Sequence, residues 1–221
     1  MTVEERRRGL VRAARLLSES GIMSHTGHVN LSARIDAERM LLAGGTVAAV
    51  KETSFAVVGA DGQVEEGTLD ASTAEIVGMH AAVYGPLPEA GAVVHTHSPH
   101  ATAFALARRP LPCRYEALLR RGQYGEMPVA AWAPRGSTAL GRAIAETVRA
   151  HPRTSALLLA NHGVLVWGPS PTAAAKLAIV VEEAAEAELR AAAIGGAKDL
   201  PPGAFTDLRP CLAPGHGDGG A

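Results

Sequence analysis

The sequence predicts a layered α/β or α+β domain in which helices cover a mixed or antiparallel sheet. Helical and strand-like segments alternate irregularly along the 221 residues, and several strand candidates are joined by hairpin-type turns. The sequence contains neither an internal repeat nor a linker long enough to separate two domains. We therefore expect one domain over residues 1–196 and a Pro- and Gly-rich tail over residues 197–221 that is partly mobile, above all beyond Pro210.

Apolar periodicity and turn residues define the elements of the first half. In order, we expect a helix over residues 3–20, a strand over 29–35, an apolar segment over 40–50 with a turn or close-approach loop at 44–46, a strand over 55–58 with a hairpin turn at 60–63, and a helix over 72–84. Ser72 and Glu75 have the spacing of a capping box at the start of the last helix.

Pro and Gly residues separate the elements of the second half. In order, we expect a short buried strand over residues 91–98, a helix over 99–106, a strand over 129–132, a helix over 138–150 that is capped by Ser137, two strands over 155–168 joined at 161–163, and a long Ala- and Glu-rich helix over 172–194. Residues 110–128 show no clear period and are not assigned to an element.

Composition excludes several classes of protein. The chain has 21 Lys and Arg residues against 22 Asp and Glu residues, so it lacks the basic excess of a nucleic-acid binder. It has no apolar run of about 18 residues, which argues against a transmembrane helix. Its two cysteines, Cys113 and Cys211, lack metal-type spacing and do not indicate a disulfide framework. A cytoplasmic globular protein is the expectation.

The strongest local signal for chemistry is His95-Thr96-His97 at the end of an apolar strand. Residues two apart point to the same face of a strand, so both imidazoles can reach one ion. Imidazole suits zinc, cobalt, nickel or iron, and three protein ligands with one open position are typical of catalytic sites. The same pattern also occurs as two ordinary strand-end histidines, so the pair alone leaves both interpretations open.

Other candidates lie elsewhere in the chain. His162 lies in the turn between two apolar strands, where a histidine either approaches the core or faces solvent. Glu75 is an acid in an Ala-rich helix, and serves either as a helix cap or as a functional acid. His28 fits a hydrogen-bonding role as well as a substrate contact. His80 and His100 fit packing or the support of a metal ligand.

Four motifs then occur in a fixed order along the chain: HVNLSAR at residues 28–34, Glu75 ahead of a short helix, AVVHTHSPHATA at 92–103 and ANHGVLVWG at 160–168. Together they resemble the class II aldolase/adducin-head family, over roughly residues 5–196. That family includes fuculose-phosphate aldolase, ribulose-phosphate 4-epimerase and related decarboxylases and dehydratases. The resemblance implies a three-layer α/β/α domain with a central, mainly antiparallel sheet. It also implies a homotetramer with active sites between neighbouring subunits.

The resemblance also assigns roles to individual residues. These are metal binding for His95, His97 and His162, acid–base catalysis for Glu75, and substrate binding for Asn30 and Ser32. The expected ion is zinc, with manganese, cobalt or iron as alternatives. An ion held by neutral imidazoles keeps its positive charge and can stabilise the enediolate formed when a carbon–carbon bond next to a ketone breaks. Glu75 would then move the proton.

The substrate loops depart from the family pattern. Phosphate-binding members carry a Thr-Gly pair in the second loop and two serines before the acid, whereas this chain has Gly45-Thr46 and Thr73-Ala74. We expect Gly45, Thr46 and Thr73 to contact substrate, because backbone N–H groups and a hydroxyl can hold an anion. A carboxylate or an unphosphorylated substrate is the alternative to a phosphate.

Aldolase members also use a tyrosine of the neighbouring subunit as a second proton donor. The region after the His-Thr-His motif offers Tyr115 and Tyr124 for this role, and we assign it to Tyr115.

The sequence thus predicts a divalent-metal-dependent carbon–carbon lyase of the aldolase type, acting on a small sugar phosphate or hydroxy-keto compound. The alternative is a decarboxylase, dehydratase or epimerase that uses the same metal site on a keto acid or an unphosphorylated substrate. A third hypothesis, a non-catalytic module like the adducin head, is disfavoured because the three histidines and Glu75 are present together. Neither a nucleic acid nor a membrane is an expected partner.

Overall fold

Eight strands form one sheet in the computed structural model, which describes residues 1–208. The strands are β1 (His28–Arg34), β2 (Arg39–Thr46), β3 (Ala56–Gly59), β4 (Val64–Glu66), β5 (Ala92–Thr96), β6 (Val129–Ala130), β7 (Ala156–Leu159) and β8 (Gly163–Gly168). Their order across the sheet is β4-β3-β2-β1-β5-β8-β7-β6. Every neighbouring pair is antiparallel except β6 with β7. The expected mainly antiparallel central sheet is confirmed.

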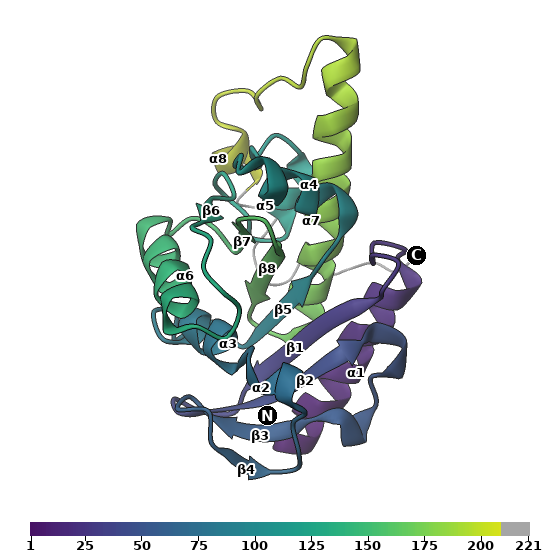
Figure 1. The fold of residues 1–221 in the computed structure, drawn as a ribbon. Coiled ribbons are helices and arrows are strands. Elements are labelled where there is room, and N and C mark those ends of the chain that lie inside the picture. The colour runs from purple at the N-terminus through teal and green to yellow at the C-terminus, as the bar shows by residue number, and fades with distance from the viewer. Residues whose placement is uncertain (209–221) are drawn as a thin grey trace.

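Helices cover both faces of this sheet (Figure 1). They are α1 (Val3–Glu19), α2 (Ala71–Ala74), α3 (Val77–Tyr84), α4 (Pro99–Ala107), α5 (Glu116–Arg120), α6 (Thr138–Ala150), α7 (Pro171–Ala191) and α8 (Ala204–Leu208), with 3₁₀ turns at Val47–Ala49, Glu52–Ser54 and Ala192–Ile194. One apolar core contains residues of α1, α4 and α7 on one face of the sheet. A second core contains residues of α3 and α6 on the other face. The layers are therefore α/β/α, as expected.

The described helices include none that is both long enough and apolar enough to cross a membrane.

The helix expected over residues 72–84 begins earlier and is interrupted. Asp70 is the N-cap of α2, because its side chain accepts a hydrogen bond from the backbone N–H of Thr73 at 2.8 Å. The hydroxyl of Ser72 donates to Asp70 and caps nothing. Glu75 stands at the C-cap of α2, so the predicted capping box of Ser72 and Glu75 is wrong. The Glu75 carboxylate is thereby left available for another contact.

Three other segments differ from expectation or add to it. Residues 44–46, expected as a turn or a close-approach loop, form the end of β2 because the ladder with β1 continues to Thr46. The close approach is found at Gly44, where a Cβ atom would lie 2.6 Å from Asn30 Oδ1. The unassigned stretch contains α5, which is too short to show a period. The expected tail contains α8, and its Phe205 ring packs on Tyr124 with centroids 4.6 Å apart. The part of that tail beyond Pro210 lies outside the described residues.

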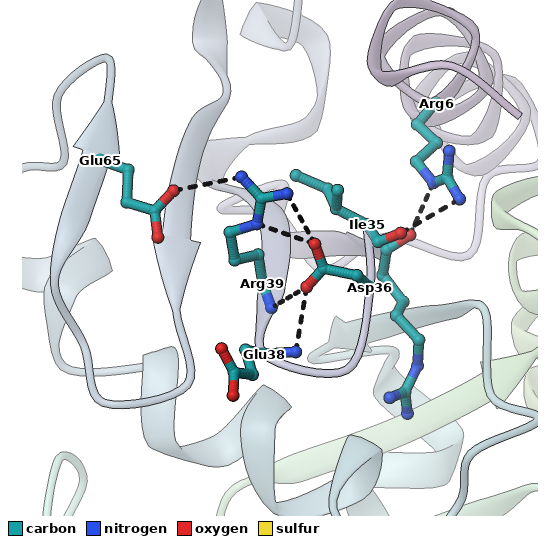
Figure 2. A network of polar contacts seen from close by, with 7 residues as sticks. Arg6, Ile35, Asp36, Glu38, Arg39 and Glu65 are labelled. Atoms are coloured by element: carbon teal, nitrogen blue, oxygen red, sulfur yellow. Dashed lines mark hydrogen bonds and ion pairs between the residues drawn. The ribbon is translucent and has the colours of Figure 1, made fainter.

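The turn between β1 and β2 holds the register of the strand that carries His28 and Asn30. Asp36 Oδ1 accepts from the backbone N–H of Glu38 at 3.0 Å and of Arg39 at 2.9 Å, and Arg39 Nε donates to Asp36 Oδ2 at 2.8 Å (Figure 2). A slip of one residue would turn His28 and Asn30 to the opposite face of the sheet. This turn therefore supports residues at the far end of β1.

Candidate metal and catalytic site

The start of β1 and the ends of β2 and β5 meet on one side of the sheet. We call this side, which runs across the strand ends and not along an outer strand, the edge of the sheet. Asn30 of β1 lies opposite Gly44 of β2 on one side and opposite His95 of β5 on the other. His28, two residues before Asn30, lies opposite Thr46 and points to the same face as Asn30. The antiparallel register therefore gathers polar side chains from three strands at this edge.

Four histidines form a cluster there, consisting of His28, His95, His97 and His162. Nε2 of His95 and Nε2 of His97 lie 3.1 Å apart. The His162 ring centroid lies 4.8 Å from that of His95 and 5.1 Å from that of His97. His28 stacks on His97 with centroids 4.8 Å apart. The three histidines expected from the sequence therefore come together, and a fourth joins them.

One histidine has its tautomer set by the sheet. His95 is fully buried, and its Nδ1 lies 2.9 Å from the carbonyl oxygen of Val164, so that nitrogen donates its proton to the strand. The lone pair of His95 is then left on Nε2, which faces His97. A ring oriented by a backbone carbonyl on one side and open to a ligand on the other is the usual state of a metal-binding histidine.

The remaining rings are held neutral by their surroundings. Burial, together with His162 and His28, lowers the pKa of His97 to about 4. Burial also lowers the pKa of His95, His162 and His28, and the charge of Arg135 acts in the same direction on the last two. Neutral imidazole is the form that binds a metal ion, so the donor set fits a divalent cation of the zinc type near pH 7.

The closest set of donor atoms is not the set expected from the sequence. One donor atom each from His28, His95 and His97 lie within 4.8 Å of one another. His162 shares the cluster through its ring contacts. The geometry thus offers four imidazoles for a site that requires three.

Glu75 lies in this region through its contact with an arginine. Its Oε2 is 3.3 Å from Nε of Arg135, and 53% of its side chain is exposed. Arg135 also donates to the carbonyl oxygen of Ser72, which ties the loop after β6 to α2. The carboxylate is therefore held by a guanidinium whose charge is also felt by His28, His97 and His162.

Asn30 and Thr73 converge on the backbone of Gly44. A Cβ atom at Gly44 would lie 2.6 Å from Asn30 Oδ1 and 2.9 Å from Thr73 Oγ1, so only glycine fits between these side chains. Thr73 is buried and its hydroxyl donates to Asp70 at 3.0 Å. Gly45 and Thr46 follow at the exposed end of β2. Four of the five expected substrate residues thus lie at the same edge of the sheet as the histidines.

Ser32, the fifth, lies behind that edge. It is fully buried, and its Oγ lies 2.7 Å from His80 Nδ1 and 2.8 Å from the Tyr84 hydroxyl. These bonds place the Ser32 hydroxyl in a closed network with α3, without an open side for a substrate. The expected packing role of His80 agrees with its position, where no exposed surface remains.

The burial of His80 predicts that the free energy of unfolding decreases at acid pH. Burial lowers the pKa of His80 to about 3, and its Nε2 is buried without a hydrogen-bond partner. Between about pH 3 and 6.5 the unfolded chain binds a proton at this residue that the folded chain rejects, so the free energy of unfolding falls as the pH falls below 6.5. We expect the His80→Phe protein to take up about one proton fewer than the wild type when it unfolds below pH 6.5, so its free energy of unfolding should fall less steeply with pH. Urea unfolding at pH 7, 6 and 5 measures this, with exposed His25→Gln as the control that keeps the wild-type slope.

Glu182 of α7 anchors the chain just beyond the His-Thr-His motif. Its Oε1 accepts from the backbone N–H and from Nδ1 of His100, both at 2.8 Å, and its Oε2 accepts from the Ala101 N–H at 2.9 Å. Ser98, the N-cap of α4, makes no side-chain cap, so the buried Glu182 carboxylate satisfies this helix start instead. His100 thus pairs with Glu182 of α7, and its expected support of a metal ligand stays a prediction.

Gly163 packs closely against the histidine cluster, and we expect a larger residue at this position to disturb it. A Cβ atom there would lie 2.6 Å from the carbonyl oxygen of Thr96 and 2.8 Å from His97 Cδ2. Because the carbonyl belongs to a central strand, we expect Gly163→Ala to lower the free energy of unfolding by about 1–3 kcal/mol and to weaken metal binding. Urea unfolding and zinc titration measure both effects. Gly78→Ala in α3, where a Cβ meets nothing within 4 Å, should leave both unchanged or raise stability slightly.

Tyr115 is the N-cap residue of α5 and is 42% exposed. It borders a groove with residues of the second half of α7, among them Ala184 and Glu188. A role in the site of its own chain therefore gains no support from its position, whereas an exposed tyrosine remains accessible to a neighbouring subunit.

The sequence pattern did not predict that His28 joins the other three histidines, and it did not single out Arg135. His28 has the same two-residue spacing from Asn30 as His95 has from His97, and that spacing could have placed it on the ligand face. Arg135 lies in a loop between β6 and α6, where an isolated arginine carries no local signal. Only the packing of that loop on α2 shows that it reaches Glu75.

Comparisons with known proteins agree with this geometry. The model of the Class II Aldolase and Adducin N-terminal domain matches residues 8–189. The 5-methylthioribulose-1-phosphate/5-deoxyribulose-1-phosphate aldolase of Rhodospirillum rubrum is 31% identical over 196 residues, covering 88% of this chain and 85% of that protein. An L-ribulose-5-phosphate 4-epimerase of Salmonella paratyphi B is 33% identical over 168 residues, covering 71% and 72%. The structure of an L-fuculose 1-phosphate aldolase superposes with a TM-score of 0.80 at 25% identity, covering 96% and 98%.

Proposed function

We propose, since this chain belongs to the class II aldolase and adducin family, that it is a divalent-metal-dependent carbon–carbon lyase acting on a small sugar phosphate or hydroxy-keto compound. The observation that carries the proposal is the cluster of neutral histidines at the edge of the sheet. The aldolase relative, which aligns over most of both chains, supports the aldolase type of reaction. We further propose a cytoplasmic homotetramer with active sites between subunits.

His95, His97 and His162 would hold the metal, with His28 beside them as a substrate contact or an alternative ligand. We propose zinc, with manganese, cobalt or iron as alternatives. A divalent cation supplies positive charge that stabilises negative charge developing on a substrate oxygen when the bond next to a carbonyl breaks. The chain's own contribution is to lower the pKa of the four rings through burial and to orient His95 through the Val164 carbonyl.

The proton is moved by Glu75 in this proposal. Its half-exposed carboxylate lies beside Arg135, outside the tight group of donor nitrogens, so it can accept a proton from a substrate held at the cluster. Asn30, Thr73, Gly45 and Thr46 are proposed to contact the substrate. Their supporting observation is the shared position at the ends of β1, α2 and β2.

Tyr115 is proposed as the second proton donor. It would act in the site of a neighbouring subunit, because it is exposed and borders a groove that none of the four histidines lines.

A decarboxylase, dehydratase or epimerase is the second candidate. Two observations favour it: the epimerase relative at 33% identity, and the Thr73-Ala74 sequence where phosphate-binding members of the family carry two serines. Each of these reactions also develops charge next to a carbonyl and could use the same cluster.

The proposal is tested by product analysis. The zinc-loaded full chain is incubated with ketose 1-phosphates, including 5-deoxyribulose 1-phosphate and L-fuculose 1-phosphate, and the release of aldehyde is followed with and without a chelator. We expect release that depends on metal. Carbon dioxide from β-keto acids, or epimer formation without aldehyde, would replace the aldolase with the second candidate. Inactivity on the whole panel together with absence of bound metal would refute the enzymatic proposal.

A further inference from the structure

A permanent positive charge lies beside a cluster that is suited to a cation. The guanidinium of Arg135 contacts Glu75 at 3.3 Å and donates to the carbonyl of Ser72. The next residue, Gly136, packs closely on Glu75, because a Cβ atom at Gly136 would lie 3.3 Å from Glu75 Cβ. The position of the guanidinium thus follows from the packing of the loop on α2, so the charge is held close to the cluster.

Such a charge disfavours the binding of a metal ion nearby, since like charges repel. Its presence therefore needs a counter-charge, which Glu75 supplies in the structure. These contacts use only part of the five N–H donors of an arginine, and 36% of the Arg135 side chain is exposed. A guanidinium with unused donors on a solvent-facing side, next to a cation site, is suited to a planar or tetrahedral anion.

We propose that Arg135 binds the anionic group of the substrate, a carboxylate or a phosphate, and that this anion replaces Glu75 on the guanidinium. The replacement would release the Glu75 carboxylate beside the histidine cluster at the moment when substrate is bound. Arg135 would then determine specificity for anionic substrates and would couple substrate binding to the availability of the base. This inference rests on the proposed function, because it places the substrate at the same site.

The test is anion binding by the full chain, measured by calorimetric titration on zinc-loaded and on chelator-treated protein. The probes are glycolate for a carboxylate and inorganic phosphate for a phosphate. We expect Arg135→Gln to weaken the binding of the preferred anion by about tenfold or more, since it removes a charge-assisted pair of hydrogen bonds. Arg135→Lys, which keeps the charge and loses the fork, should give an intermediate loss.

Glu75→Gln should have the opposite effect. It removes the competing carboxylate, so binding of the anion should tighten by at least about threefold. The matched control is Arg39→Gln, which removes an exposed arginine side chain paired with Asp36 and Glu65 at the far end of β1 (Figure 2). The backbone N–H bonds to Asp36 that form the turn do not involve this side chain and stay in place. This control should bind both probes as the wild type does.

Several outcomes would overturn the inference. Binding of both anions by Arg135→Gln within twofold of the wild type would refute it, as would equal losses in Arg39→Gln or no binding by the wild type. Unchanged binding in Glu75→Gln would refute the replacement of Glu75. Metal content and turnover of the same wild-type preparation test the proposed function separately. Anion binding by the chelator-treated protein tests Arg135 in the absence of metal and of turnover. The probe that binds identifies the anion as carboxylate or phosphate.

Discussion

His97→Ala is expected to abolish both bound metal and turnover while leaving the fold intact. His97 lies one residue beyond β5 and is only half-buried, so its truncation removes no core packing. Its Nε2 is 3.1 Å from His95 Nε2, and both nitrogens belong to the close donor group. Loss of a group that merely supports a ligand costs about 10–100-fold in metal affinity, so loss of a ligand should cost at least as much. Elemental mass spectrometry, circular dichroism and the aldehyde assay measure the three effects.

Two further variants separate the roles of the other histidines. If His162 completes the ligand set, His162→Ala should lose metal as His97→Ala does, whereas His28→Ala should keep metal and raise KM. The reverse pattern would make His28 the third ligand, in agreement with the closest nitrogen atoms. Full metal content and full turnover in His97→Ala would refute the site. His151→Ala, an exposed histidine at the end of α6, is the control that should change nothing.

Strand alternation made much of this site predictable. It places His95 and His97 on one side of the chain, and the apolar run before them predicts the buried strand that orients the pair. The turn between β7 and β8 was likewise predictable, and Asn161 there adopts the positive φ of 57° that asparagine tolerates. Both features depend on residues that are close in the sequence, so the spacing of apolar, polar and turn residues is enough to predict them.

Features that depend on distant contacts were not predictable. The end of β2 carries turn-like glycines, yet pairing with β1 extends the strand through them. In the same way, Arg135 reaches Glu75 only because the loop after β6 packs on α2. Each outcome is decided by tertiary competition between local options of similar energy.

Glu75→Gln is expected to keep bound metal and lose about 10²–10⁴-fold in turnover, which is the usual contribution of a general acid or base. The substitution preserves the shape of the side chain and its ability to accept a hydrogen bond from Arg135, but an amide cannot take up a proton at neutral pH. Because the carboxylate lies outside the close group of histidine nitrogens, the imidazoles alone should retain the ion. Metal content and kcat of the zinc-loaded variant measure the two effects separately.

The matched control for this prediction is Glu65→Gln. Glu65 is also a partly exposed acid paired with an arginine, at 3.4 Å from Arg39, and it lies on the edge strand β4 (Figure 2). Its loss removes the same charge and the same kind of ion pair, so it should leave kcat unchanged. Equal kcat values for Glu75→Gln and wild type would exclude the acid–base role. Loss of metal in Glu75→Gln would instead make Glu75 a ligand of the resting site, since neutral imidazoles would then be insufficient to retain the ion. A decrease in kcat with metal retained requires that the carboxylate act on the substrate rather than on the ion.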